Sequence, residues 1–196
     1  KNKNENENYN SSFKKNKILK KILIAPSWGG QGMIESGLCK NLINQLLELG
    51  HEVILRPHPQ TLKFAKEKIA DIKNQYKKNL GFIFEDGVID HTSLYESDLM
   101  VSDWSGVAIE YALTFNKPVI FCDIPRKINN PNFMHIKIEP IEVSIRENIG
   151  VIWDCKSSIK DIIELCLQKI KAKESDLSLM RNQHCFNLGV SDEVFA

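Results

Sequence analysis

Short apolar runs recur along the chain and predict a series of buried β-strands. The expected strands cover residues 20–26, 52–55, 81–84, 99–101, 119–122 and 150–153. Their apolar character is nearly continuous rather than alternating, which is typical of strands covered on both faces.

Between these runs, apolar residues recur with the helical period. Helices are expected at 36–49, 61–77, 105–115 and 157–180, with a short helical turn at 93–97 and an irregular segment at 126–147. Strands that alternate with amphipathic helices predict an α/β fold, here a Rossmann-like parallel sheet with helices on both faces. Ligands of such sheets bind outside the carboxyl ends of the strands.

The first residues of the chain do not follow either pattern. Residues 1–17 alternate Asn, Lys and Glu with few apolar side chains, which predicts a disordered linker. Residues 18–196 are expected to form one domain, and a domain preceded by a linker is expected to be part of a longer polypeptide.

Composition narrows the classes of partner. The formal net charge is +1, and no basic patch with interleaved aromatic residues is present, so no nucleic-acid partner is predicted. The apolar runs are too short to cross a bilayer, and no signal peptide is visible. Five cysteines without paired spacing indicate reduced thiols, and together these features predict a cytoplasmic protein.

The strongest candidate chemistry follows the strand at 99–101. Ser105 and Gly106 stand where the next helix begins, so its first N–H groups and the positive end of its dipole predict an anion site. Glu110 lies one turn further, within reach of a ligand bound there. The alternative is an ordinary strand–helix joint with Ser105 as the N-cap.

A second candidate follows the strand at 52–55, which ends in Arg56-Pro57-His58-Pro59. Arg56 suits bidentate binding of phosphate oxygens, and His58 can donate to a phosphate or carry a proton. The prolines restrict the backbone on both sides of the histidine. A surface arginine and an N-capping turn are the alternative.

The glycine-rich loop after the first strand, residues 27–32, fits neither common phosphate-binding pattern. No lysine follows as in a Walker loop, and Glu35 stands where the dinucleotide fingerprint needs glycine, so no dinucleotide cofactor is predicted. The loop either lets a ligand or partner approach the backbone or is a plain turn. Asp103 has no second acid at Asp-x-Asp spacing, so no metal is predicted. Asp90 and His91 either border a base or phosphate or lie in a solvated loop.

Several stretches occur in an order that resembles a known family. They are Ile22–Gly29, Arg56–Pro59, Ser97–Leu113 and Lys117–Phe121, with Phe186–Gly189 and Ser191 near the end. Together they resemble the carboxy-terminal domain of the CDP-glycerol glycerophosphotransferase family, of the teichoic-acid polymerase type. That domain is the donor-binding half of a GT-B fold.

The resemblance implies a nucleotide-diphosphate donor bound between two Rossmann-like domains, with the acceptor held mainly by an amino-terminal domain. His58 matches a family histidine near the donor phosphates and is the expected catalytic residue. Glu110 matches the position at which related proteins, including UDP-GlcNAc 2-epimerases, hold ribose. The remaining expected donor contacts are Ser27, Gly29, Arg56, Ser102, Asp103, Ser105 and Gly106.

The implied reaction transfers glycerol phosphate from CDP-glycerol to a hydroxyl of a growing cell-surface polymer, with CMP leaving. Trp104 stands where the family usually has Tyr, and Gly106 where it often has Ser, so the donor stays open. The alternatives are a nucleotide-sugar domain of a glycosyltransferase or UDP-GlcNAc 2-epimerase type, or a non-catalytic nucleotide-binding module. Without the amino-terminal domain, the isolated chain is expected to be inactive. Peripheral association with the inner face of the cell membrane stays an alternative to a purely cytoplasmic location.

Overall fold

The computed structural model describes residues 20–86, 90–126, 128, 130–172, 174–188 and 190, and within these the side chains of 170–172 and 174–176 are left out. The linker expected at 1–17 lies outside the described residues, as do Gly189 and Ser191.

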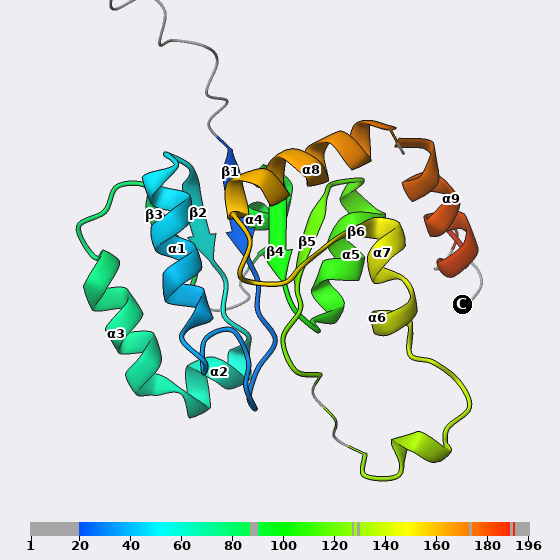
Figure 1. Cartoon of the computed structure of the whole chain (residues 1–196), viewed down its shortest axis with the longest axis horizontal. Helices are drawn as coiled ribbons and strands as arrows, with labels where there is room; N and C mark the ends of the chain where they lie inside the picture. The colour runs from blue at the N-terminus through cyan, green and yellow to red at the C-terminus, as the bar shows by residue number, and fades with distance from the viewer. Residues whose placement is uncertain are drawn as a thin grey trace, which may run out of the picture.

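Among the described residues, six parallel strands form a single sheet (Figure 1). The strands are β1 (Lys21–Ile24), β2 (Glu52–Leu55), β3 (Phe82–Phe84), β4 (Leu99–Ser102), β5 (Val119–Cys122) and β6 (Gly150–Trp153). Each corresponds to one of the apolar runs. Their order in the sheet is β3-β2-β1-β4-β5-β6. The chain adds β2 and β3 on one side of β1 and then β4, β5 and β6 on the other side, so the strand order reverses between β1 and β4.

Helices cover both faces of the sheet. One face carries α1 (Leu38–Glu48), α3 (Lys66–Tyr76) and α8 (Ile159–Ala172), and the other carries α4 (Thr92–Glu96), α5 (Gly106–Phe115), α7 (Arg146–Ile149) and α9 (Glu174–His184). Within β1, Ile22 and Ile24 pack into the first layer and Leu23 into the second, and all three are fully buried. This double burial explains the continuous apolar strands, and the predicted α/β fold class is confirmed.

One of the predicted helical regions is divided. The region 61–77 forms α2 (Pro59–Phe64) and α3, which are separated by Ala65 with φ −115° and ψ 40°. This break does not fall at Gly or Pro, so local propensity carries no signal for it. The described residues of the region 157–180 lie mainly in α8 and α9.

The segment predicted as irregular also contains helical structure. It holds the 3₁₀ turn η1 (Phe133–His135), α6 (Ile141–Ser144) and the start of α7. Ile145 and Ile149 are buried against α5 and α9, so tertiary packing stabilises helical turns too short to form alone.

The reversal of strand order places a crevice at the carboxyl ends of β1 and β4. After β1 and β4 the chain leaves toward opposite sides of the sheet, and the two loops diverge. In Figure 1 the carboxyl ends point toward the lower edge, where the long β5–α6 connection extends away from the sheet.

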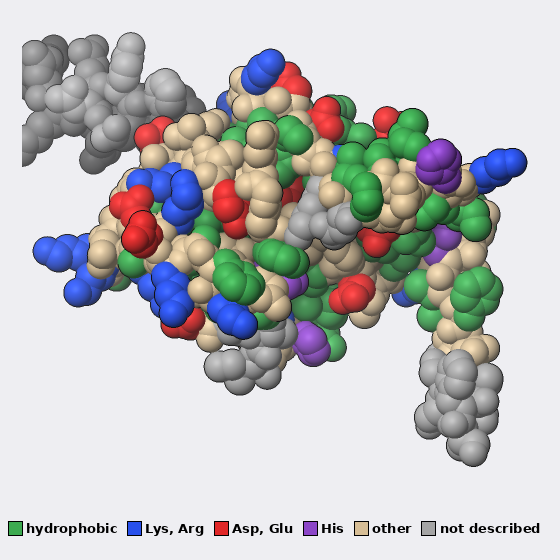
Figure 2. Space-filling model, turned by 90° about the horizontal axis from the view of Figure 1, so that it is seen from below, with side chains coloured by type: hydrophobic (Ala, Val, Ile, Leu, Met, Phe, Trp, Pro, Cys, Tyr) green, Lys and Arg blue, Asp and Glu red, His purple; other side chains and the backbone are tan. Residues whose placement is uncertain are grey.

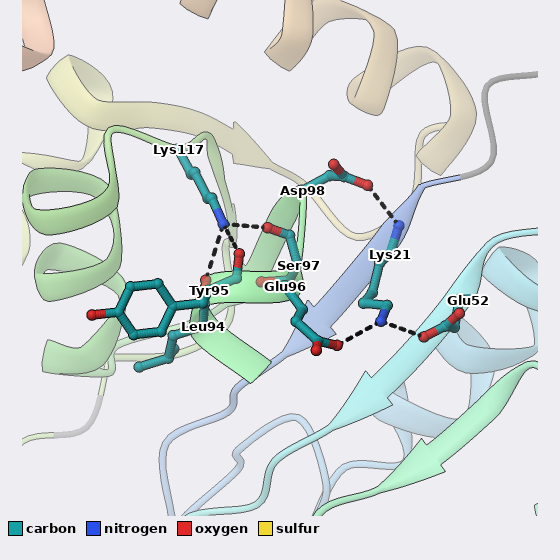
Figure 3. A network of polar contacts seen from close by, with 8 residues as sticks. All are labelled: Lys21, Glu52, Leu94, Tyr95, Glu96, Ser97, Asp98 and Lys117. Carbon is teal, nitrogen blue, oxygen red and sulfur yellow. Dashed lines mark hydrogen bonds and ion pairs between the residues drawn. The ribbon is translucent and has the colours of Figure 1, made fainter. Parts of the chain in front are cut away.

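A polar network at the opposite edge holds α4 in place (Figure 3). The ammonium group of Lys117 donates to the carbonyl oxygens of Leu94, at 3.2 Å, and Ser97, at 2.8 Å, and also to that of Tyr95. These carbonyls at the end of α4 have no partner within the helix, so the lysine side chain supplies the hydrogen bonds that they lack. Burial lowers the pKa of the half-buried Lys117.

Lys21 extends the same network across β1. Its backbone N–H donates to Asp98 at 2.9 Å, and its side chain pairs with Glu96 at 2.7 Å and Glu52 at 3.0 Å. The C-terminal end of α4 is thereby tied to the amino-terminal edge of the sheet (Figure 3).

Replacing Lys117 with Met should lower the free energy of unfolding by about 1–3 kcal/mol, because carbonyls at the end of α4 lose a charged donor. Urea denaturation measures this loss. Lys78→Met, at an exposed position, is the control and should change stability by less than about 0.5 kcal/mol. An equal effect of the two substitutions would show that the Lys117 contacts contribute nothing.

Candidate functional site

Two adjoining cavities open at the carboxyl ends of β1, β2 and β4. The larger, of about 360 Å³, is bordered by Ser27, Trp28, His58, Trp104, Ser105, Gly106, Arg126, Pro140, Glu142 and Val143. The smaller, of about 160 Å³, shares His58 and Ser105 with it, so the start of α5 lies between the two. Figure 2 looks onto this edge and shows acidic and basic side chains interspersed with hydrophobic ones.

The start of α5 is open toward these cavities. Ser105 occupies the N-cap position with φ −89° and ψ 131°, but its side chain makes no capping hydrogen bond. The first N–H groups of a helix have no carbonyl partner in a preceding turn. A Cβ placed on Gly106 would meet nothing within 4 Å, so space lies directly above this terminus. The geometry therefore favours the anion site over a joint closed by the Ser105 side chain.

His58 is held by its backbone neighbours and by an aromatic ring. Its Nδ1 accepts the backbone N–H of Gln60 at 3.1 Å, so His58 is the N-cap of α2. In the neutral ring this bond assigns the proton to Nε2, which becomes the donor. The ring stacks on Trp28 with centroids 6.1 Å apart. His58 borders both cavities.

Glu110 has the position predicted from helical spacing. It lies one turn into α5, is exposed, and borders the smaller cavity together with His91. Within the described part of the chain, Glu110 forms no ion pair. Its carboxylate is therefore available to hydroxyl groups of a ligand.

Arg56 differs from the expectation. Its guanidinium is only 6% exposed, and NH1 donates to Glu85 Oε1 at 2.7 Å, to Ser93 Oγ at 3.0 Å and to the carbonyl of Asp90 at 3.0 Å. Its charge is balanced by Glu85, so Arg56 joins the β3–α4 connection to β2 rather than presenting an unpaired cation. A role of Arg56 in phosphate binding stays a prediction.

Ser102 and Asp103 lie beneath the site and border neither cavity. They are 0% and 1% exposed, and a direct contact of either residue with a ligand stays a prediction. Ser102 Oγ donates to the carbonyl of Ala25 at 2.6 Å, and Asp103 Oδ1 accepts the N–H groups of Ser27 and Trp104, both at 2.7 Å. Both residues thus join the loop after β1 to the turn after β4.

Burial raises the pKa of Asp103, although the two N–H groups that it accepts oppose this shift. Its second oxygen, Oδ2, is buried and has no hydrogen-bond partner in the described part of the chain. An ionised Asp103 therefore costs free energy in the folded state.

Ser27 borders two cavities, whereas Gly29 borders one. Ser27 lines the larger cavity and, together with Gly29, a third cavity of about 460 Å³ at the glycine-rich loop. Gly29 and Gly30 have φ values of 75° and 60°, which L side chains rarely adopt. The Gly29 N–H donates to Glu35 at 3.0 Å.

Trp28, Trp104, Arg126 and Glu142 also border the larger cavity but were not predicted as site residues. Arg126 follows β5 at the same edge of the sheet as Arg56 follows β2, so its position after a strand was an available signal. Glu142, in α6, had no such signal in the sequence, because its segment is predicted as irregular.

Two further observations concern metal binding and the membrane. Among the described residues, no group of three or more His, Cys, Asp or Glu is arranged to hold a metal ion. In that same part of the chain, every helix is too short or too polar to traverse a bilayer.

Asp103→Ala should lower the free energy of unfolding by roughly 1–3 kcal/mol, because two N–H groups lose their acceptor. Asp103→Asn keeps an oxygen acceptor and should lose less. Because the folded pKa of Asp103 is raised, the wild-type protein should lose stability relative to Asp103→Asn as pH rises from below 3.8 through the folded pKa. Chemical denaturation of both proteins across this range measures the difference, and a pH-independent difference would contradict the prediction.

Two solved structures are similar at low sequence identity. UDP-GlcNAc 2-epimerase from Methanocaldococcus jannaschii, in complex with UDP-GlcNAc and UDP, is 16% identical with a TM-score of 0.49, covering 76% of this chain and 39% of its own. The C-terminal CMP-Kdo binding domain of WaaA from Acinetobacter baumannii is 15% identical with a TM-score of 0.44, covering 82% and 86%. The chain therefore spans about 39% of the epimerase. No curated protein sequence matches significantly.

A family model gives the assignment. The model described as CDP-Glycerol:Poly(glycerophosphate) glycerophosphotransferase matches residues 1–125, which is well over half of the chain. The matched segment includes β1, β2, β4 and α5, and thus the open helix start and His58. The chain accordingly belongs to the CDP-glycerol:poly(glycerophosphate) glycerophosphotransferase family.

Proposed function

We propose that the domain expected at residues 18–196 binds the nucleotide diphosphate of a CDP-activated donor. In this proposal it forms the donor half of a GT-B transferase that moves glycerol phosphate to a hydroxyl of a growing cell-surface polymer. The acceptor would be held mainly by another domain. The proposal includes a cytoplasmic location, with association at the inner face of the membrane as the alternative.

The open start of α5 between two cavities carries the proposal. A helix N-terminus without a side-chain cap offers backbone N–H groups and a positive dipole end to an anion. The cavity on one side contains Glu110, and the cavity on the other is larger and shares His58. A diphosphate at the helix start would therefore have a carboxylate for ribose hydroxyls on one side and space for the transferred group on the other.

The smaller cavity suits the nucleoside. Its wall includes Glu110, Leu94 and the exposed ring of His91, which can border a base. In this orientation the phosphate nearest the ribose lies at Gly106, and the second phosphate extends into the larger cavity. Family membership supports cytidine as the base.

The residues of this chain would act on the leaving group. When an acceptor hydroxyl attacks the β-phosphorus of CDP-glycerol, the bond from that phosphorus to the bridging oxygen breaks and CMP leaves. The N–H groups at the start of α5 and the Nε2–H of His58 would stabilise the charge that develops on the departing phosphate. The proton of the acceptor hydroxyl would go to a base other than His58 and the start of α5.

Calorimetric titration of the chain with CMP, CDP, UMP and UDP tests the proposal. We expect CDP to bind more tightly than CMP, because a second phosphate is contacted, and more tightly than UDP. A preference for uridine would favour the nucleotide-sugar alternative. Absence of binding by all four nucleotides would contradict a donor site in this chain.

Gly106→Asp tests the helix start in the same titration, and Gly106→Asn is its matched control. An added side chain meets open space, and an acid in the first turn of a helix favours the helix dipole, so stability should be retained. The carboxylate should nevertheless repel the phosphates and weaken CDP binding by roughly 100-fold or more, equivalent to about 2.7 kcal/mol. Gly106→Asn adds similar volume without charge and should weaken it less.

His58→Asn separates the two roles of the histidine. Asparagine is a good N-cap and can still accept the Gln60 N–H, so stability should change by less than about 0.5 kcal/mol. It lacks an Nε2–H, and CDP affinity should fall roughly 2- to 10-fold, as for loss of one hydrogen bond. Calorimetry and thermal melts measure the two effects, and unchanged affinity with unchanged stability would remove His58 from the donor site.

A further inference from the structure

A diphosphate in the larger cavity needs positive charge, and the described residues supply little of it. Arg56 is paired with Glu85 and borders only the smaller cavity. Arg146 is 3% exposed and lies behind Trp104, with its guanidinium carbon 3.9 Å from the ring centroid. Neither guanidinium faces the larger cavity.

Arg126 is the described arginine that borders the larger cavity. It is exposed and lies in the loop after β5, and it also borders the third cavity beneath the glycine-rich loop. Among the described residues no carboxylate is ion-paired with it, although Glu142 is part of the same cavity wall. Its charge is thus available to a ligand.

The stem of this loop is fixed next to the site. Trp104, which precedes the start of α5, donates its Nε1–H to the carbonyl of Ile124 at 3.0 Å. The N–H of Asp123 donates to the carbonyl of Trp153 at 2.8 Å. Arg126, two residues beyond Ile124, also lies against the ring of Phe133 at 5.7 Å. Arg126 therefore lies near the fixed stem of the loop, beside the cavity, although the loop extends outward farther along the chain.

We propose that Arg126 binds the phosphate of the donor that lies farther from the nucleoside. The proposal rests on the proposed function, in which ribose lies near Glu110 in the smaller cavity. The nearer phosphate then meets the start of α5, and the farther one enters the larger cavity. Arg126 borders this larger cavity but not the smaller cavity that would hold the ribose. A guanidinium fork matches two phosphate oxygens. Arg126 lies immediately after the segment that the family model matches, so family membership does not assign it.

Three substitutions test this assignment. Arg126→Gln removes the charge, Arg126→Lys keeps the charge without the fork, and Lys137→Gln removes a charge from the same loop. Lys137 borders an adjacent apolar groove but not the larger cavity, so it controls for general electrostatics. Both positions are exposed, and thermal melts should be unchanged in all three variants.

The readout is calorimetric affinity for CDP compared with CMP. Arg126→Gln should weaken CDP roughly 10- to 100-fold and CMP less than about 3-fold, because only CDP carries the farther phosphate. Arg126→Lys should fall between wild type and Arg126→Gln, and Lys137→Gln should match wild type for both nucleotides.

Equal losses for CMP and CDP would overturn the assignment to the farther phosphate, as would a loss in Arg126→Gln no greater than in Lys137→Gln. Both results presuppose a wild-type protein that binds CDP. If the wild-type chain binds no nucleotide, the proposed function itself fails, and this outcome is distinct from a failure at Arg126 alone.

Discussion

One carboxylate oxygen holds together the two loops that form the site. Oδ1 of Asp103 accepts a hydrogen bond from the turn that leads into α5 and another from the loop after β1. These loops are 76 residues apart in the sequence, and the neighbouring Ser102 adds a bond to the carbonyl of Ala25. The position of the helix start relative to the glycine-rich loop depends on these buried contacts. The Ser102–Ala25 bond is buried, and a hydrogen bond in such surroundings is electrostatically stronger than one at the surface.

The fold was predictable because its main signal is local. The strands are buried on both faces, so each appears as a continuous apolar run, and β2, β5 and β6 have the bounds that the runs predict. The position of Glu110 was predictable for the same reason, since helical spacing alone places it one turn from Gly106. Tertiary effects were not visible: nothing around Ala65 marks the break between α2 and α3, and α7 is stabilised by burial against distant helices.

The roles of individual side chains were harder to predict than their location. The sequence shows that Arg56 and Asp103 follow strands, and both do lie at the carboxyl edge of the sheet. It does not show that Glu85, 29 residues after Arg56, neutralises this arginine, nor that Asp103 points into the interior. A residue at a strand end can face the ligand or support the loop beneath it, and the choice depends on partners from other strands. Arg126 is the opposite case: the segment that begins with it has no periodic pattern and was not expected to contribute to the site, yet Arg126 borders the cavity.

The absence of a side chain at Gly106 has a thermodynamic consequence. The donors at the start of α5 are backbone N–H groups, and the freedom of this backbone is already lost when the helix folds. A phosphate that binds there does not need to immobilise a rotamer, whereas contact with a long arginine side chain costs about 0.5–1.5 kcal/mol of side-chain freedom. In the proposed donor site, the backbone donors would thus be organised before the ligand arrives, and the entropic cost of binding would fall on the side chains at the rim of the cavity.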